Sequence, residues 1–249
     1  MIRLRKSQER GHARHGWLDS YHTFSFAHYH DPRYMGYSVL RVINEDVIAP
    51  GRGFGMHPHN DMEIITYMLD GELRHEDSLG NGSVIRKGDV QRMTAGSGIV
   101  HSELNASDSN PAHLLQIWIL PNRTNIHPGY EDKHFDESRK KGRWCLIASQ
   151  DGHGDSLMVH QDVALYAAVL EQNQSLSYEM RPERTLYIQV AHGSIRLGGA
   201  GAAEQTLSAG DAAMVEMEHM IRVEAVQDAE VLVFDLPVGN MAYVQNNTL

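Results

Sequence analysis

The sequence predicts an all-β protein made of two barrels in tandem. Its apolar and β-branched runs are short, as in YSVLRVIN (37–44), HLLQIWIL (113–120) and AEVLVFDLP (229–237). Turn signals such as LDGE, LGNGS, RKGD and LGGAG recur between these runs. Many short strands with frequent turns are typical of a β-sandwich or β-barrel.

An internal duplication predicts that there are two such barrels. TYMLDGEL followed by VIRKGDVQRMTAG resembles IQVAHGSI followed by TLSAGDAAMVEME. In each copy a strand runs into a glycine turn, at Gly71 or Gly193, and a Gly-Asp pair follows after the same interval. Self-similarity of this kind indicates two copies of one structural unit.

The polar stretch between the copies separates the two predicted domains. We expect a first barrel over residues 1–132, a connector over 133–144, a second barrel over 145–238 and a loose tail over 239–249. Within the connector, KHFDESRKKG favours one short helix that ends at Gly142.

Composition excludes several classes of protein. The chain has 249 residues, a formal charge of −10 and a pI near 5.8, which argues against a nucleic-acid partner. It contains neither a membrane-spanning apolar run nor a secretory signal, so we expect a cytoplasmic protein without a membrane partner. Cys145 is the single cysteine, which excludes a disulfide within the chain and a thiolate metal cluster. The 16 histidines favour nitrogen and oxygen ligands instead.

Two short segments together predict a metal site. GRGFGMHPHNDME contains His57 and His59, and AGSGIVHSELN contains His101 and Glu103. In a strand, residues two apart face the same side. Two strands that line one barrel would therefore bring three imidazoles and one carboxylate together, with open positions left on a divalent first-row ion.

Other histidines are interpreted more plainly. The pair His28 and His30 has no companion motif, so we interpret it as structural or surface. His75 could lie near the mouth of the first barrel, but a surface imidazole is the simpler interpretation. His219 is the lone candidate in the second barrel, which we therefore predict to be free of metal.

Two longer stretches resemble known motifs. GRGFGMHPHNDMEIITYMLDG resembles the first cupin motif and GDVQRMTAGSGIVHSELN resembles the second. The run from WLDSYHTFSFAHYHDPRYMGYSVLRVIN through both motifs to HLLQIWILP resembles the pirin family. The resemblance implies a bicupin with one metal ion in the N-terminal barrel, held by His57, His59, His101 and Glu103.

The sequence departs from the general cupin pattern at one ligand. The usual cupin glutamate would fall on Ile64, which cannot bind a metal, and Glu63 lies one residue earlier. A shift of one residue turns a side chain to the other face of a strand. Glu63 is then either a structural acid that could hold a ligand imidazole or a solvated acid at a strand start, and Glu103 supplies the carboxylate.

Pirins of this bacterial type are similar to quercetin 2,3-dioxygenases, which open the central ring of flavonols with O2 and release carbon monoxide. The resemblance implies a flavonol-like substrate, O2 and a divalent metal, with Fe2+ preferred over Ni, Cu, Mn, Co or Zn. We expect Glu103 to act as ligand and base, and plausible residues of an apolar mouth are Phe54, Met56, Met93 and Trp118. The alternative is a metal-bearing regulatory protein that binds a transcription factor or a metabolic enzyme without turnover. The natural substrate and the oligomeric state stay open.

Overall fold

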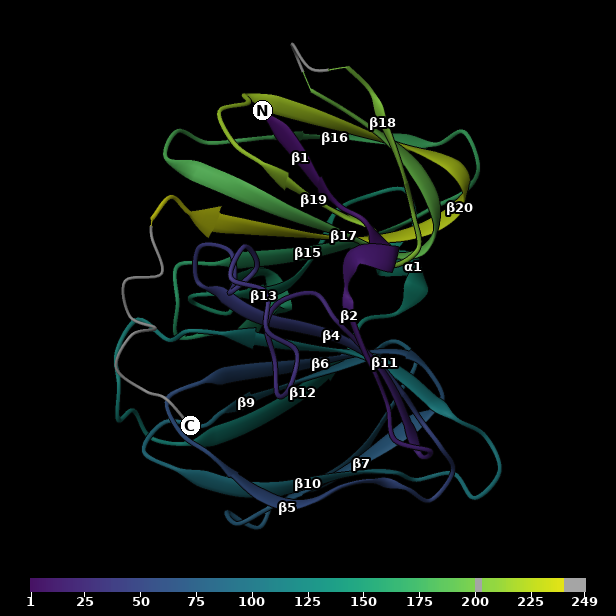
Figure 1. Ribbon diagram of the computed structural model, residues 1–249. Coiled ribbons are helices and arrows are strands. Elements are labelled where there is room, and N and C mark those ends of the chain that lie inside the picture. The colour runs from purple at the N-terminus through teal and green to yellow at the C-terminus, as the bar shows by residue number, and fades with distance from the viewer. Residues whose placement is uncertain (200–202, 240–249) are drawn as a thin grey trace.

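A computed structural model describes residues 1–199 and 203–239 of the chain (Figure 1). The molecule is all-β and consists of two cupin barrels stacked on one another, which confirms the predicted fold class. The first barrel forms the lower half of Figure 1 and the second barrel forms the upper half.

Two facing sheets build the first barrel. One has seven strands in the order β12-β9-β6-β11-β4-β3-β2, and the other has four strands in the order β5-β10-β7-β8. The strands are β2 (Gly11–Arg14), β3 (Leu18–His22), β4 (Leu40–Ile48), β5 (Gly53–His59), β6 (Glu63–Asp70), β7 (Glu72–Asp77), β8 (Gly82–Arg86), β9 (Asp89–Thr94), β10 (Ile99–Asn105), β11 (Ala112–Ile119) and β12 (Gly129–His134). Every pairing between them is antiparallel.

The second barrel is formed by one nine-stranded sheet. Its main path is β1-β19-β17-β20-β15-β13-β14, with β16 paired to β20 and β18 paired to β17. The strands are β1 (Ile2–Arg5), β13 (Cys145–Ser149), β14 (Leu157–Met158), β15 (Ala164–Leu170), β16 (Ser175–Glu179), β17 (Arg184–Gly199), β18 (Gln205–Ser208), β19 (Ala212–Val215) and β20 (Met220–Pro237).

The two predicted repeats turn in the same way. Gly71 and Gly193 both have a positive φ, at 74° and 73°. A side chain at Gly71 would collide with the carbonyl oxygen of Pro111, and one at Gly193 would collide with that of Asp228. Both positions therefore require glycine for conformation and for space.

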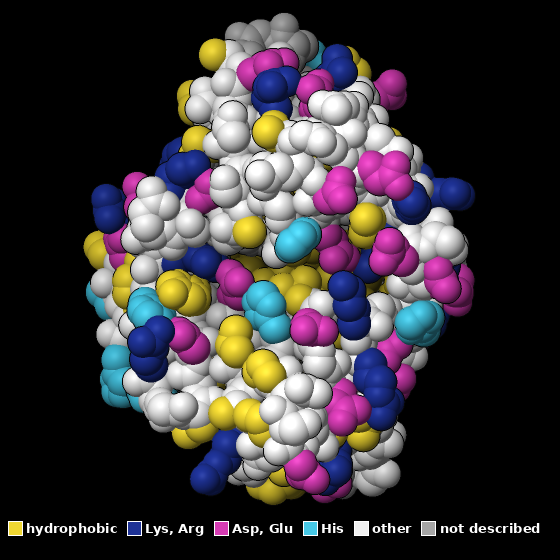
Figure 2. All heavy atoms as spheres, turned by 90° about the vertical axis from the view of Figure 1, so that its right-hand side faces the viewer, with side chains coloured by type: hydrophobic (Ala, Val, Ile, Leu, Met, Phe, Trp, Pro, Cys, Tyr) yellow, Lys and Arg dark blue, Asp and Glu magenta, His cyan; other side chains and the backbone are white. Residues whose placement is uncertain are grey.

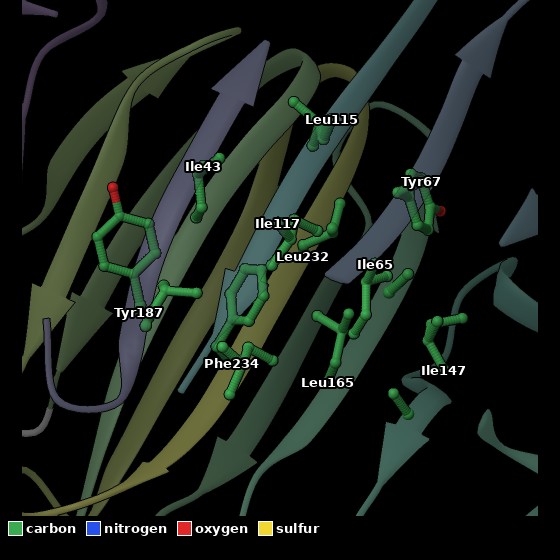
Figure 3. Close-up of a cluster of buried hydrophobic side chains, with 14 of the residues drawn as sticks. Ile43, Ile65, Tyr67, Leu115, Ile117, Ile147, Leu165, Tyr187, Leu232 and Phe234 are labelled. Carbon is green, nitrogen blue, oxygen red and sulfur yellow. The ribbon is translucent and has the colours of Figure 1, made fainter. Parts of the chain in front are cut away.

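The largest hydrophobic cluster lies between the barrels rather than inside either one. Figure 3 shows side chains of the first barrel facing side chains of the second across this layer. The first barrel supplies Ile43, Ile65, Tyr67, Leu115 and Ile117, and the second supplies Ile147, Leu165, Tyr187, Leu232 and Phe234. The barrels thus share one apolar core, which fixes their relative position.

A hollow lies between the two halves on the side shown in Figure 2. Hydrophobic side chains form its floor, and charged and histidine side chains surround it. A cavity of about 650 Å3 between the barrels is lined by residues of both, among them Leu69, His113, Val169 and Glu230. In the described part of the chain, no helix is both long and apolar enough to cross a membrane.

The strand pairing differs from the predicted domain division at the N-terminus. We assigned residues 1–132 to the first barrel, but β1 pairs with β19 of the second barrel. The short helix is present as α1 (Glu137–Lys140), capped by the Asp136 carboxylate, which accepts from the Ser138 amide. The boundaries at 132 and 145 stay a prediction, and residues 240–249 of the predicted tail lie outside the described residues.

Candidate metal centre

Two paired strands carry the predicted ligands. In β5, His57 and His59 are two residues apart, and His57 lies directly opposite His101 of β10. A bulge follows, so that Glu103 lies opposite Phe54. Bulges re-aim side chains at the rims of barrels, and here the bulge sets how the carboxylate lies relative to the histidines.

The structure brings the three histidines together. Ligand atoms of His57, His59 and His101 all lie within 4.8 Å of one another. The Nε2 atoms of His57 and His101 are 3.1 Å apart. With metal–nitrogen bonds of about 2.1 Å, neighbouring ligand atoms on one ion lie about 3 Å apart. The spacing of these two nitrogens therefore fits a shared ion.

The protonation of the imidazoles also fits a metal. Burial, reinforced by the neighbouring imidazoles, lowers the pKa of His59 to about 4 and that of His101 to about 3. Both rings are therefore neutral near pH 7 and carry a free lone pair. His57 donates from Nδ1 to the Gly55 carbonyl oxygen at 2.7 Å, which leaves its Nε2 as the lone-pair nitrogen.

Glu103 lies beside this group and is fixed by three donors. Its carboxylate forms a second, overlapping group with His75 and His101, again within 4.8 Å. Three side chains from the facing sheet donate to it: Gln91 at 2.9 Å, Gln116 at 2.7 Å and Thr66 at 3.2 Å. The carboxylate is thus held in one orientation, and the assignment of all four side chains as ligands stays a prediction.

His75 is fully buried, so the interpretation as a surface imidazole is wrong. Its Nδ1 lies 3.4 Å from Nδ1 of His101, and its Nε2 lies 3.3 Å from the Asp77 carboxylate. The ring also stacks on Tyr130. A chain from Asp77 through His75 to His101 therefore holds the nitrogen of His101 that does not face His57. Such partners set the tautomer and orientation of a ligand imidazole.

A cavity of about 740 Å3 opens onto the three histidines and Glu103. Phe54 and Trp118 line it, as predicted. Met56 does not, since it is 61% exposed on the outer side of β5. Met93 does not line it either, because it packs in the core with Ile64, Ala95 and Ile99. Both predictions of a lining role were wrong. His28 and His30 are exposed, and His28 also lines the cavity.

Glu63 is a buried acid of the contact between the barrels. It accepts from the Thr94 hydroxyl at 3.0 Å and from the His160 backbone amide at 3.3 Å, and the His160 ring lies 3.3 Å away. Burial raises its pKa. The solvated interpretation is wrong, and its imidazole neighbour is His160 of the second barrel rather than a predicted ligand. Ile64 lines the cavity as an apolar residue.

Four buried polar residues on β3 and β4, which the sequence analysis did not find, form one wall of the cavity. They are Ser20, His22, Asn44 and Asp46. Burial, together with the charges of Glu103 and Glu45, raises the pKa of Asp46 to about 7, against the opposing hydrogen bond from Ser20. Alternation along Asn44, Asp46 and Ile48 was the available signal, but polar residues at alternate positions also fit a solvated face.

Comparison with known proteins gives the family. Residues 3–119 match the Pirin family, and residues 146–236 match the quercetinase C-terminal cupin domain. The quercetin 2,3-dioxygenase of Escherichia coli strain K12 is 48% identical over 95% of this chain and 99% of its own. The chain belongs to the pirin family.

Further relatives agree with this assignment. A pirin-like protein of Caulobacter vibrioides is 38% identical over 94% of this pirin and 99% of its own chain. The crystal structure of the bacterial pirin YhhW from Escherichia coli, in complex with nickel(II), has 47% identity and a TM-score of 0.89, covering 96% of this pirin and all of that chain. The predicted family is confirmed, and this pirin is quercetin 2,3-dioxygenase-like over nearly its whole length.

Proposed function

We propose that this pirin is a metal-dependent dioxygenase that opens the central ring of flavonols with O2 and releases carbon monoxide. The observation that carries the proposal is the set of three converging imidazoles and one fixed carboxylate at the wall of a 740 Å3 cavity. The names of its relatives, which include quercetin 2,3-dioxygenase, support the same reaction.

His57, His59, His101 and Glu103 would hold one divalent ion. The bound ion would supply a Lewis acid for the ionised 3-hydroxyl group of a flavonol and would assist electron transfer to O2. We propose Fe2+, with Ni, Cu, Mn, Co or Zn as alternatives, because imidazole and carboxylate ligands suit each of these ions. The nickel(II) complex of the related Escherichia coli pirin supports binding of a divalent ion.

Glu103 has room for one further partner. A carboxylate offers about four lone-pair positions, and donors already occupy three of them here. The remaining position can bind a metal or accept the substrate's 3-hydroxyl proton, but it cannot do both at once. We infer that Glu103 would use this position either to hold the ion or to act as the base for the 3-hydroxyl group.

The rest of the cavity would position the substrate. Trp17, Phe54, Phe26 and Trp118 are aromatic side chains of its lining. Trp118 meets the His59 ring edge to face at 4.9 Å, and Phe26 meets Trp118 in the same way at 5.4 Å. Flat aromatic surfaces of this kind favour planar rings and keep water away from the histidines.

Reconstitution tests the proposal directly. The protein is stripped of metal, loaded anaerobically with Fe2+, Mn2+, Co2+, Ni2+ or Cu2+, and mixed with quercetin and air. We expect loss of the flavonol absorbance and release of carbon monoxide with at least one metal. No turnover with any metal would contradict the proposal and favour the regulatory alternative, in which the cytoplasmic protein binds a protein partner.

A further inference from the structure

We propose that the wall of β3 and β4, formed by Ser20, His22, Asn44 and Asp46, is a subsite for hydroxyl groups of the substrate. The inference rests on the proposed function and adds to it the residues that bind the further hydroxyl groups of the substrate. The preferred substrate is a polyhydroxylated aromatic compound, whose extra hydroxyl groups bind this wall while the flavonol 3-hydroxyl faces the metal centre.

Asp46 is the unusual member of this wall. Its side chain is 2% exposed and lines the cavity. Among the described residues, the Ser20 hydroxyl is its one hydrogen-bond partner, and it donates to Oδ1. The other oxygen, Oδ2, has no partner in that part of the chain. Because Asp46 lines the cavity and Oδ2 is not sealed from it, a bound molecule can donate a hydrogen bond to this oxygen.

Two other buried acids of the same barrel have fuller sets of hydrogen-bond donors. Glu103 accepts from three side chains. Asp77 accepts from the backbone amides of Leu79 and Asn81 and from the Asn81 side chain, and it faces His75. Asp46 has no such set of donors, although Gln116, a donor to Glu103, lines the same cavity. Glu63 also has an oxygen without a hydrogen-bond partner, Oε1, but that atom is buried beside His160 and Glu63 does not line the cavity, whereas Asp46 does.

His22 adds a second acceptor beside Asp46. Its Nδ1 lies 3.0 Å from the Asn44 side-chain oxygen, which can only accept, so Nδ1 carries the proton. Burial lowers the pKa of His22, so the ring is neutral and its Nε2 is a lone-pair acceptor. The ring is held against Phe26 at a centroid distance of 5.2 Å.

The chemistry of these atoms defines the ligand. Oδ2 of Asp46 in its ionised form and Nε2 of His22 both accept hydrogen bonds, and both belong to residues that line the cavity. A ligand that satisfies them must bring O–H donors on a body flat enough to lie among Phe26, Trp118 and Trp17. A phenol or catechol ring meets both requirements, whereas an unsubstituted phenyl ring would leave both acceptors unpaired.

The test compares two flavonols that differ only in these groups. Quercetin and 3-hydroxyflavone both carry the 3-hydroxyl, but 3-hydroxyflavone lacks the others. Their Kd values are measured on the metal-free protein by quenching of Trp17 and Trp118 fluorescence, and kcat/KM is measured on the reconstituted protein. We expect quercetin to be preferred by about 10- to 100-fold.

Two variants and one control decide the origin of that preference. Asp46→Asn and His22→Phe should each reduce the preference by about tenfold and leave the Kd of 3-hydroxyflavone nearly unchanged. Glu45→Gln is the matched control, because this neighbouring acid pairs with Arg10 and His113 and does not line the cavity. It should keep the full preference.

The outcomes separate this inference from the proposed reaction. If neither flavonol is turned over, the proposed function fails, and the Kd ratio of the metal-free protein still tests the subsite. If folded Asp46→Asn and His22→Phe proteins keep the wild-type ratio, or if the wild type shows no preference, the subsite is refuted. If Asp46→Asn does not fold, His22→Phe alone decides.

Discussion

The two barrels share a strand pattern but differ in the side chains that face their interiors. The second barrel encloses one continuous apolar cluster, which includes Leu186, Ile188, Val231 and Val233. In the first barrel the apolar residues fall into two small clusters, one around Leu73 and one around Met93. The buried polar residues of the first barrel include Thr66, His75, Gln91, His101, Glu103, Asn44, Asp46 and Gln116.

This difference shows how one fold serves two purposes. Inward apolar residues pack to interior density and contribute stability. Inward polar side chains need hydrogen-bond partners from the protein or from a ligand. Each one that lacks a partner reduces the stability of the folded state. The second barrel and the apolar layer between the barrels therefore contribute stability that offsets the buried polar residues inside the first barrel.

The largest expected effect follows from removing a ligand in the first barrel. His57→Ala or His101→Ala should reduce metal content and quercetin turnover together to background, because each removes one of the converging imidazoles. Metal analysis of the purified protein gives the first readout. The matched control is His219→Ala in the second barrel, which should change neither quantity, and a metal-loaded, active His101→Ala protein would refute the assignment.

The next prediction tests whether the apolar interior of the second barrel stabilises the whole protein. Ile188 is fully buried in its apolar cluster. Ile188→Ala should lower the free energy of unfolding by about 2–5 kcal/mol, because it leaves a cavity. Denaturant titration measures this loss. Metal content below the unfolding transition should stay at the wild-type value, and its loss from the folded variant would show that the second barrel shapes the site directly.

A pH titration sharpens the comparison at Asp46. Its pKa is raised from 3.8 to about 7, so the folded state holds this proton more tightly than the unfolded state. The protonated Asp46 side chain contributes fully to the free energy of unfolding below about pH 4. This contribution is lost as the pH rises to about 7, by up to about 4 kcal/mol.

The comparison is made on metal-free protein by thermal unfolding between pH 4 and 8. Asp46→Asn should lack this loss and should become the more stable protein near pH 8. Glu63, also with a raised pKa, contributes the same sign to both proteins and cancels in the difference. Parallel curves for the two proteins would show that Asp46 is ionised throughout.

The smallest effect concerns the residues behind His101. His75→Phe or Asp77→Asn should weaken metal binding by about 10- to 100-fold, because both remove the orientation of the ligand imidazole. Asp77→Asn retains most of the shape and can reverse the tautomer of His75. Metal affinity by chelator competition is the readout. His134→Phe, at an exposed histidine that pairs with Asp89, is the control and should bind metal normally.

The sequence was sufficient for the fold and for the grouping of the three histidines, because both depend on alternation. His57 and His59 share a face by strand parity, and the repeated glycine turns at Gly71 and Gly193 indicated two barrels. The same rule could have found His75, since Leu73, His75 and Asp77 alternate with exposed residues along β7. It was missed because a histidine between charged neighbours also fits a surface strand.

Other features depend on contacts between distant segments. The bulge that places Glu103 opposite Phe54 arises from the pairing of β5 with β10, and neither strand shows it alone. Glu63 could not be linked to His160 from the sequence, because the two residues belong to different barrels. Met56 is exposed on one face of its strand and Met93 is buried in the core. The residue type alone does not reveal which face or how much burial a methionine has.

The pairing of β1 with β19 has a consequence for synthesis on the ribosome. Ile2 must find Val215, which is translated almost last. At 5–20 residues per second, the first strand waits on the order of ten seconds or more for its partner. During that time the metal-binding half can collapse while its leading segment is still unpaired. The strands β1 and β19 can therefore pair only after residues 212–215 have been synthesised.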